Sequence, residues 1–62
     1  MNERQIEALR LMVNEGQEMT NAMYQELFEV SRRTATRDLK ALVRTGWVRQ
    51  KGTRKGTRYV AE

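Results

Sequence analysis

The sequence contains no cysteine, no histidine and no proline. Without cysteine the chain forms no disulfide and no thiolate metal site, and without histidine it lacks the commonest zinc ligand and general base. A chain of 62 residues also has room for only a small core. We therefore expect one domain, residues 1–62, that depends on the packing of helices for its stability.

Several functional signatures are absent as well. No nucleophile stands in a pattern with a base or a carboxylate pair, and the four glycines form no P-loop or dinucleotide-binding loop. No apolar run approaches transmembrane length, and the first residues, MNERQIEALR, lack the apolar core of a signal peptide. We expect a cytoplasmic protein that is not an enzyme, has no catalytic residue, metal or cofactor, and binds no membrane.

Charge is divided unevenly between the two halves of the sequence. Residues 1–30 hold two arginines and six glutamates, a net charge of −4, whereas residues 31–62 hold ten lysines and arginines and two acidic residues, a net charge of +8. The modest total of +4 thus conceals a strongly basic half. Such asymmetry is typical of a protein with a polyanionic partner, although a solvated basic surface would show it too.

The first segment is predicted to be a helix that begins after Asn2 and continues to about residue 14. Asn2 and Gln5 stand at the two positions of a capping box, and Gly16 suits the left-handed end of a helix. The apolar residues at helical spacing, and hence the expected core stripe, are Ile6, Leu9, Met12 and Val13. Leu11 lies off this stripe, as an isolated exposed side chain or as a contact for another domain or a second copy.

A second, shorter helix is predicted to begin at Thr20 or Asn21 and to end near residue 28. Met19, just before it, is expected to pair as a very short strand or to pack against the helix, and residues 29–30 form a tight turn. The expected buried face of this helix consists of Tyr24, Leu27 and Phe28.

After Gly46 the pattern changes to that of a β-hairpin. Residues 47–51 and 57–60 carry the β-branched and aromatic side chains that strands favour, and a glycine-bounded basic tip, residues 52–56, separates them. Trp47 and Tyr59 are expected to pack the hairpin onto the helices, with stacking on unpaired bases as the rival role. The predicted fold is therefore mainly α with a small β-hairpin.

The third helix carries the strongest signal in the sequence. It is predicted to begin after Ser31 and to end at about Thr45, with Asp38 in a structural role near the core. Its core-facing residues are Ala35, Leu39, Leu42 and Val43, and an uninterrupted row of cations lies opposite: Arg33, Arg37, Lys40 and Arg44. Like-charge pairs four residues apart weaken a helix, and cations at its start oppose the dipole. A bound anion such as phosphate would offset both the repulsion between the cations and their unfavourable interaction with the helix dipole.

The shape of this helix favours duplex DNA as the anion. An α-helix fits the major groove of B-DNA, which is about 12 Å wide, and arginine binds guanine bidentately there. A-form RNA hides its major groove from side chains, so double-stranded RNA fits less well. A membrane surface fits least, because the apolar face of the helix is needed for the core.

The segments VSRRTATRDLKALVRTGWV, residues 30–48, and GTRKGTRYV, residues 52–60, resemble the winged helix-turn-helix domain of bacterial transcription regulators. The resemblance is closest to the DeoR type and to the C-terminal winged helices of Fic-family proteins and ATP-binding transcriptional regulators. It covers nearly the whole chain. Trp47 departs from the pattern, because this place usually holds Ile or Leu. Since such domains are usually parts of longer proteins, the resemblance also implies that this chain belongs to a longer protein.

This resemblance implies a function in transcription regulation through sequence-preferring binding of double-stranded DNA. The recognition helix, residues 31–45, would lie in the major groove, and the hairpin, residues 51–58, would form the wing on the backbone or in the minor groove. Such a protein would be nucleoid-associated. The implied DNA contacts are Ser31, Arg32, Arg33, Thr34, Thr36, Arg37, Lys40 and Arg44 on the helix, with Lys51, Arg54, Lys55 and Arg58 on the wing.

One alternative of a different class remains open. The same fold could serve as a protein–protein interaction module without DNA binding, using its surface for an acidic partner or for self-association. Leu11 and the acidic first half of the chain motivate this reading. The sequence also leaves open a homodimer and additional domains in the full-length protein.

Overall fold

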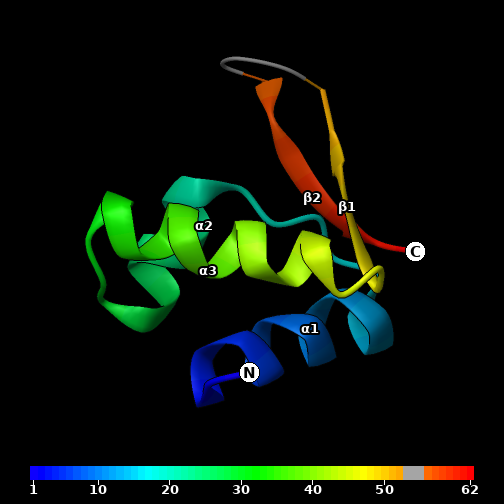
Figure 1. The fold of residues 1–62 in the computed structure, drawn as a ribbon, viewed down its shortest axis with the longest axis horizontal. Helices are drawn as coiled ribbons and strands as arrows, with labels where there is room; N and C mark the ends of the chain where they lie inside the picture. Colours follow the sequence, from blue (N-terminus) through cyan, green and yellow to red (C-terminus); the bar gives the residue numbers. More distant parts are fainter. Residues whose placement is uncertain (53–55) are drawn as a thin grey trace.

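The computed structural model describes residues 1–52 and 56–62, and it has three helices followed by an antiparallel hairpin (Figure 1). The elements are α1 (Glu3–Glu15), α2 (Asn21–Phe28), α3 (Arg32–Arg44), β1 (Val48–Lys51) and β2 (Arg58–Ala61). This confirms the predicted mainly α fold with a small hairpin, the layout of a winged helix-turn-helix. In the described residues, no helix has the length and apolar character needed to span a bilayer.

Each helix begins at a side chain that accepts a hydrogen bond from a free backbone N–H. Asn2 accepts from Gln5 in a full capping box, Thr20 accepts from Met23, and Ser31 accepts from Thr34. The predicted caps at residues 2 and 31 are therefore confirmed, and Thr20 rather than Asn21 caps α2. Such caps contribute about 1 kcal/mol each.

The turns that follow α1 and α2 use the left-handed region of backbone conformation. Gly16 ends α1 with φ 65°, as the sequence predicted. Glu29 ends α2 with φ 53°, a conformation that is uncommon for a residue other than glycine. The Val30 N–H then bonds to the Gln25 carbonyl at 3.2 Å, and only three residues separate the end of α2 from the start of α3. This tight turn fixes α2 and α3 as a close pair.

The hairpin is joined to the helices through the loop between α1 and α2. Val48 pairs with Ala61 and Lys51 with Arg58, which sets the register of β1 and β2. Met19 forms an isolated bridge to Tyr59 through two backbone hydrogen bonds of 2.9 and 2.8 Å. Met19 thus pairs with the hairpin, the first of the two roles expected for it, through a one-residue bridge outside the two-stranded sheet of β1 and β2.

The core lies where α1, α2 and α3 meet the inner face of the hairpin. Its buried members are Ala8, Met12, Met19, Tyr24, Ala35, Leu39, Leu42, Val48 and Tyr59. The predicted core residues of α3 are confirmed, with Val43 partly buried at the edge. The Tyr24 and Phe28 rings pack at a centroid distance of 4.6 Å, and Tyr59 holds the hairpin against the helices as expected.

The predicted core stripe of α1 is wrong at two positions. Ile6 and Val13 are 54% and 59% exposed, while Gln5, Ala8 and Met12 form the buried face. Gln5 can take a buried position because both polar atoms of its amide have a hydrogen-bond partner there: Oε1 accepts from the Asn2 N–H and Nε2 donates to the Asp38 carbonyl. A buried polar group with such partners costs little. Leu9 packs partly against the core.

Three further expectations about apolar residues need correction. Leu27 is 49% exposed, because the neighbouring Tyr24 and Phe28 take the inward face of α2. Trp47 is 57% exposed, because the inward position at the start of the hairpin belongs to Val48. Leu11, expected off the core stripe, packs partly against the core from α1.

Candidate nucleic-acid interface

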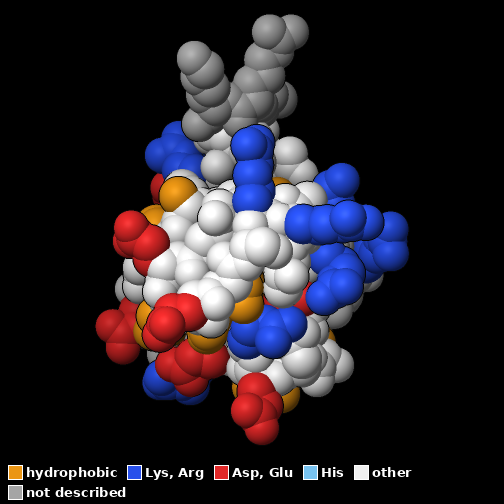
Figure 2. All heavy atoms as spheres, turned by 90° about the vertical axis from the view of Figure 1, so that its left-hand side faces the viewer, with side chains coloured by type: hydrophobic (Ala, Val, Ile, Leu, Met, Phe, Trp, Pro, Cys, Tyr) orange, Lys and Arg blue, Asp and Glu red, His pale blue; other side chains and the backbone are white. Residues whose placement is uncertain are grey.

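The outer face of α3 is a row of exposed cations. Arg32, Arg33, Arg37, Lys40 and Arg44 are all exposed, and none forms an ion pair with a carboxylate of the described residues. From Arg33 to Arg44 the row extends about 16 Å along the helix. Figure 2 shows lysine and arginine side chains gathered on one side of the molecule and acidic side chains mainly on the other. The face thus carries concentrated charge without internal neutralisation.

A polar groove of about 620 Å³ separates this helix from the hairpin. Residues of α3, the start of α2 and the inner face of the hairpin line it: Thr20, Asn21, Ala22, Gln25, Arg32, Thr36, Lys40, Gln50, Thr57 and Tyr59. Hydroxyl and amide groups are therefore placed next to the basic row. The groove brings Arg32, Thr36 and Lys40, three of the predicted contact residues, onto one surface.

Two residues on α2 that sequence reasoning missed hold Thr36 in this groove. Gln25 Nε2 donates to Asn21 Oδ1 at 2.6 Å, and Asn21 Nδ2 donates to Thr36 Oγ1 at 2.9 Å. Because the Thr36 oxygen accepts from Asn21, the hydroxyl hydrogen can still donate to an external acceptor. The spacing of Asn21 and Gln25, one helical turn apart, was the available sequence signal.

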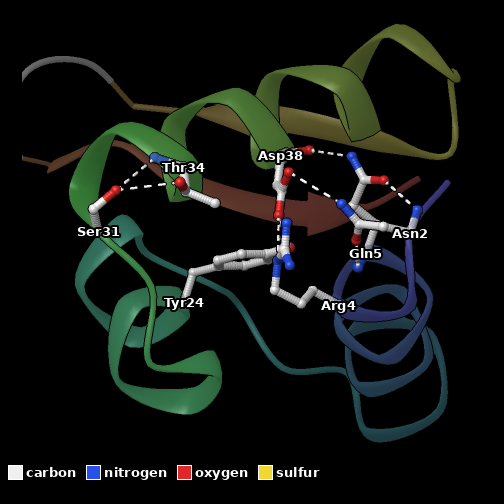
Figure 3. Close-up of polar contacts among 7 residues, drawn as sticks. All are labelled: Asn2, Arg4, Gln5, Tyr24, Ser31, Thr34 and Asp38. Carbon is white, nitrogen blue, oxygen red and sulfur yellow. Dashed lines mark hydrogen bonds and ion pairs between the residues drawn. The ribbon is translucent and has the colours of Figure 1, made fainter.

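The first turn of α3 is fixed by Ser31 and Thr34. The Ser31 hydroxyl accepts from the Thr34 N–H at 3.1 Å and donates to the Thr34 hydroxyl at 3.2 Å (Figure 3). Ser31 is exposed and Thr34 is half-buried. Arg32 and Arg33 follow directly on this capped start, so an anion bound there would meet two guanidinium groups and the positive end of the helix dipole.

Asp38, on the opposite face of α3, anchors the helix to the rest of the molecule. Its carboxylate accepts from Arg4 Nε at 2.9 Å, from the Tyr24 hydroxyl at 2.8 Å and from Asn2 Nδ2 at 3.3 Å (Figure 3). Its carbonyl oxygen accepts from Gln5 Nε2 at 3.1 Å. Asp38 therefore ties α1, α2 and α3 together, and its predicted structural role is confirmed.

These hydrogen bonds also affect the pKa values of Asp38 and Tyr24, the two buried groups at the centre of the network. Burial by itself raises the pKa of Asp38, but hydrogen bonds from Arg4, Tyr24 and Asn2 to the carboxylate outweigh it, so the pKa lies below its ordinary value of 3.8. Burial raises the pKa of Tyr24, and the hydrogen bond to Asp38 raises it further. At neutral pH the carboxylate is charged and the phenol is neutral.

The fold is therefore expected to lose stability in acid through Asp38. A pKa lowered in the folded state means that this carboxylate stabilises the fold above its ordinary pKa, and that the contribution disappears as the pH falls through the lowered value. Urea unfolding from about pH 7 to pH 2 should show a steeper loss for the wild type than for Asp38→Asn below about pH 5. Parallel curves would contradict this expectation. Glu7, whose pKa the hydrogen bond from Arg10 also lowers, is present in both proteins.

Among the described residues of the hairpin, Lys51 and Arg58 lie on the face turned away from the groove. Lys51 and Arg58 are opposite each other in the register and point outward, whereas Gln50 and Tyr59 point into the groove. Glu18, in the loop before α2, pairs with Lys51 at 3.4 Å and with Arg58 at 3.1 Å. The structure thus does not bring these two predicted wing contacts together with the α3 row. Arg54 and Lys55 lie outside the described residues.

Comparisons of the chain with models of known families, with curated proteins and with solved structures gave no match. The described residues contain no group of three or more acidic, histidine or cysteine side chains suited to a metal ion. The candidate site consists of the exposed basic face of α3 and the polar groove beside it.

Proposed function

We propose that this protein binds double-stranded DNA, with α3 in the major groove and the hairpin beside the adjacent backbone, as the DNA-binding domain of a bacterial transcription regulator. The observation that carries the proposal is the row of Arg33, Arg37, Lys40 and Arg44, exposed along one helix face without a carboxylate partner among the described residues. A face that only met solvent would gain from neighbouring carboxylates, whereas a face that meets phosphates would not.

Roles within this interface follow from position and chemistry. Arg37 is at the centre of the row and suits bidentate contact with a guanine, while Arg32 and Arg33 at the capped start suit a phosphate. Thr36, held by Asn21, can donate its hydroxyl hydrogen to a base edge or a phosphate oxygen in the groove. Phosphate contacts would supply position and most of the affinity, and the few base contacts would supply sequence preference.

The test is fluorescence anisotropy of the wild-type chain with a labelled random-sequence duplex over a salt series. If about four to five cations of α3 meet phosphates, the logarithm of the association constant should fall with the logarithm of salt concentration with a slope of about −4. A labelled single strand of the same length should bind more weakly. Absence of binding at low salt, or a slope near zero, would refute the proposal.

A further inference from the structure

A second groove lies between α1 and α2, and its lining is largely apolar. It encloses about 430 Å³ and is lined by Leu11, Gln17, Met19, Met23, Glu26 and Leu27. Leu27 is 49% exposed, and Leu11 and Met23 are half-buried although they also pack against the core. The groove shares no lining residue with the polar groove beside α3. Leu11, Met23 and Leu27 are therefore accessible to a partner that leaves the basic row free, over a floor formed by the buried Met19.

Carboxylates surround the apolar part of this groove. Glu7 and Glu15 stand one turn before and one turn after Leu11 on α1, and Glu26 is part of the lining on α2. Glu15 and Glu26 are exposed, and neither forms an ion pair with a described lysine or arginine. Figure 2 shows apolar side chains between acidic ones on the side away from most lysines and arginines. The local charge is thus opposite to that of the α3 face.

We propose that this groove docks a basic amphipathic helix of a partner protein. Apolar residues on successive turns of such a helix would fill the space between Leu11, Met23 and Leu27, and a cavity of this volume admits a few side chains. The flexible side chain of Met23, which is partly exposed, can adjust to different apolar partners. Lysine or arginine flanking the apolar residues would meet Glu15 and Glu26, whereas an acidic partner would be repelled.

The basic helix α3 of a second copy does not have the required surface. The exposed large apolar residues of the described chain are Met1, Ile6, Val13, Leu27 and Trp47, and none of them lies on the basic helix α3. The basic face would therefore bring charge but no apolar side chains to the groove. The docked helix must come from a sequence that combines both features.

The experiment uses a synthetic peptide of about 16 residues, with leucines spaced one turn apart on one face and lysines or arginines beside them. It is titrated into the 15N-labelled protein, and backbone amide shifts are followed by NMR. We expect the shifts to concentrate at Leu11, Met23 and Leu27 and to leave α3 unchanged. Two control peptides are needed: a scrambled sequence of the same composition, and the same helix with glutamate in place of every cation. Both should bind at least about tenfold more weakly.

Variants assign the binding to the groove. Leu27→Ser and, separately, Glu26→Lys should each weaken peptide binding at least about fivefold, while Ile6→Ser, at an equally exposed apolar position outside the groove, should not. Circular dichroism checks that each variant is folded. Equal binding of all three peptides, shifts centred on α3, or no binding at millimolar peptide would each overturn the proposal. So would self-association of the chain that Leu27→Ser abolishes, because the occupant would then be a second copy.

Discussion

Replacing Asp38 with alanine is expected to remove a large part of the free energy of unfolding at about 25 °C. The substitution leaves the Tyr24 hydroxyl buried without its acceptor and removes the group that Arg4 and Asn2 reach from α1. Leaving the buried Tyr24 hydroxyl unsatisfied costs about 1–3 kcal/mol, and the lost hydrogen bond from the partly exposed Arg4 adds to this cost. A chain of this size rarely has a core worth more than about 3–5 kcal/mol. Far-UV circular dichroism with urea titration measures the loss directly.

Matched variants separate the network from a general effect of removing a carboxylate. Tyr24→Phe deletes a single donor to Asp38 and is expected to cost about 1 kcal/mol. Glu15→Ala removes an exposed carboxylate with no ion pair in the described chain and should change the free energy of unfolding by less than about 0.5 kcal/mol. If Asp38→Ala cost no more than Tyr24→Phe, the three-helix role given to this carboxylate would be wrong.

The parts of the fold that sequence predicted well are those decided by local chemistry. The start of α3 follows from the Ser31 cap, and its orientation follows from apolar residues concentrated on one side, including Leu39 and Leu42. The end of α1 follows from the conformational freedom of Gly16. In each case the deciding interaction lies within a few residues of the element it fixes.

The orientation of α1 could not be predicted in the same way. A hydrophobic stripe indicated Ile6 and Val13, whereas the molecule buries Gln5 beside Ala8. Gln5 is acceptable in the core because it bonds to Asp38, a residue 33 positions along the chain. A prediction from hydrophobic periodicity assigns a glutamine to the exposed face of the helix, because its hydrogen-bond partner lies on another helix and cannot be identified from the local sequence.

The candidate interface likewise combines a local feature that the sequence predicts with contacts between distant residues that it does not. The charge of the α3 row is a property of one helix and was visible in the sequence, but the polar groove depends on how α2 and the hairpin are placed around it. The pairing of Glu18 with Lys51 and Arg58 joins residues 33 and 40 positions apart. Whether a hairpin cation faces α3 or faces Glu18 is set by the strand register, which the Met19 bridge helps to fix.

A double substitution on α3, Arg33→Ala with Arg37→Ala, is expected to weaken duplex binding about 100-fold at low salt. The magnitude of the salt slope should fall by about 1, because Arg33 is placed at a phosphate and Arg37 at a base. Both residues are exposed, alanine is the best helix former, and the change removes a like-charge pair one turn apart, so the fold should be unharmed.

The matched control is Arg10→Ala with Arg49→Ala, which lowers the net charge equally. Those two arginines are exposed and pair with Glu7 and Glu62, away from the α3 row. If binding depended only on total charge, both double variants would lose affinity alike and the proposed docking of α3 would fail. A loss of affinity only in the α3 variant would instead support contact between this helix face and the DNA. Comparing its loss on preferred and random duplexes would then separate base contacts from phosphate contacts, because only a base contact favours one sequence over another.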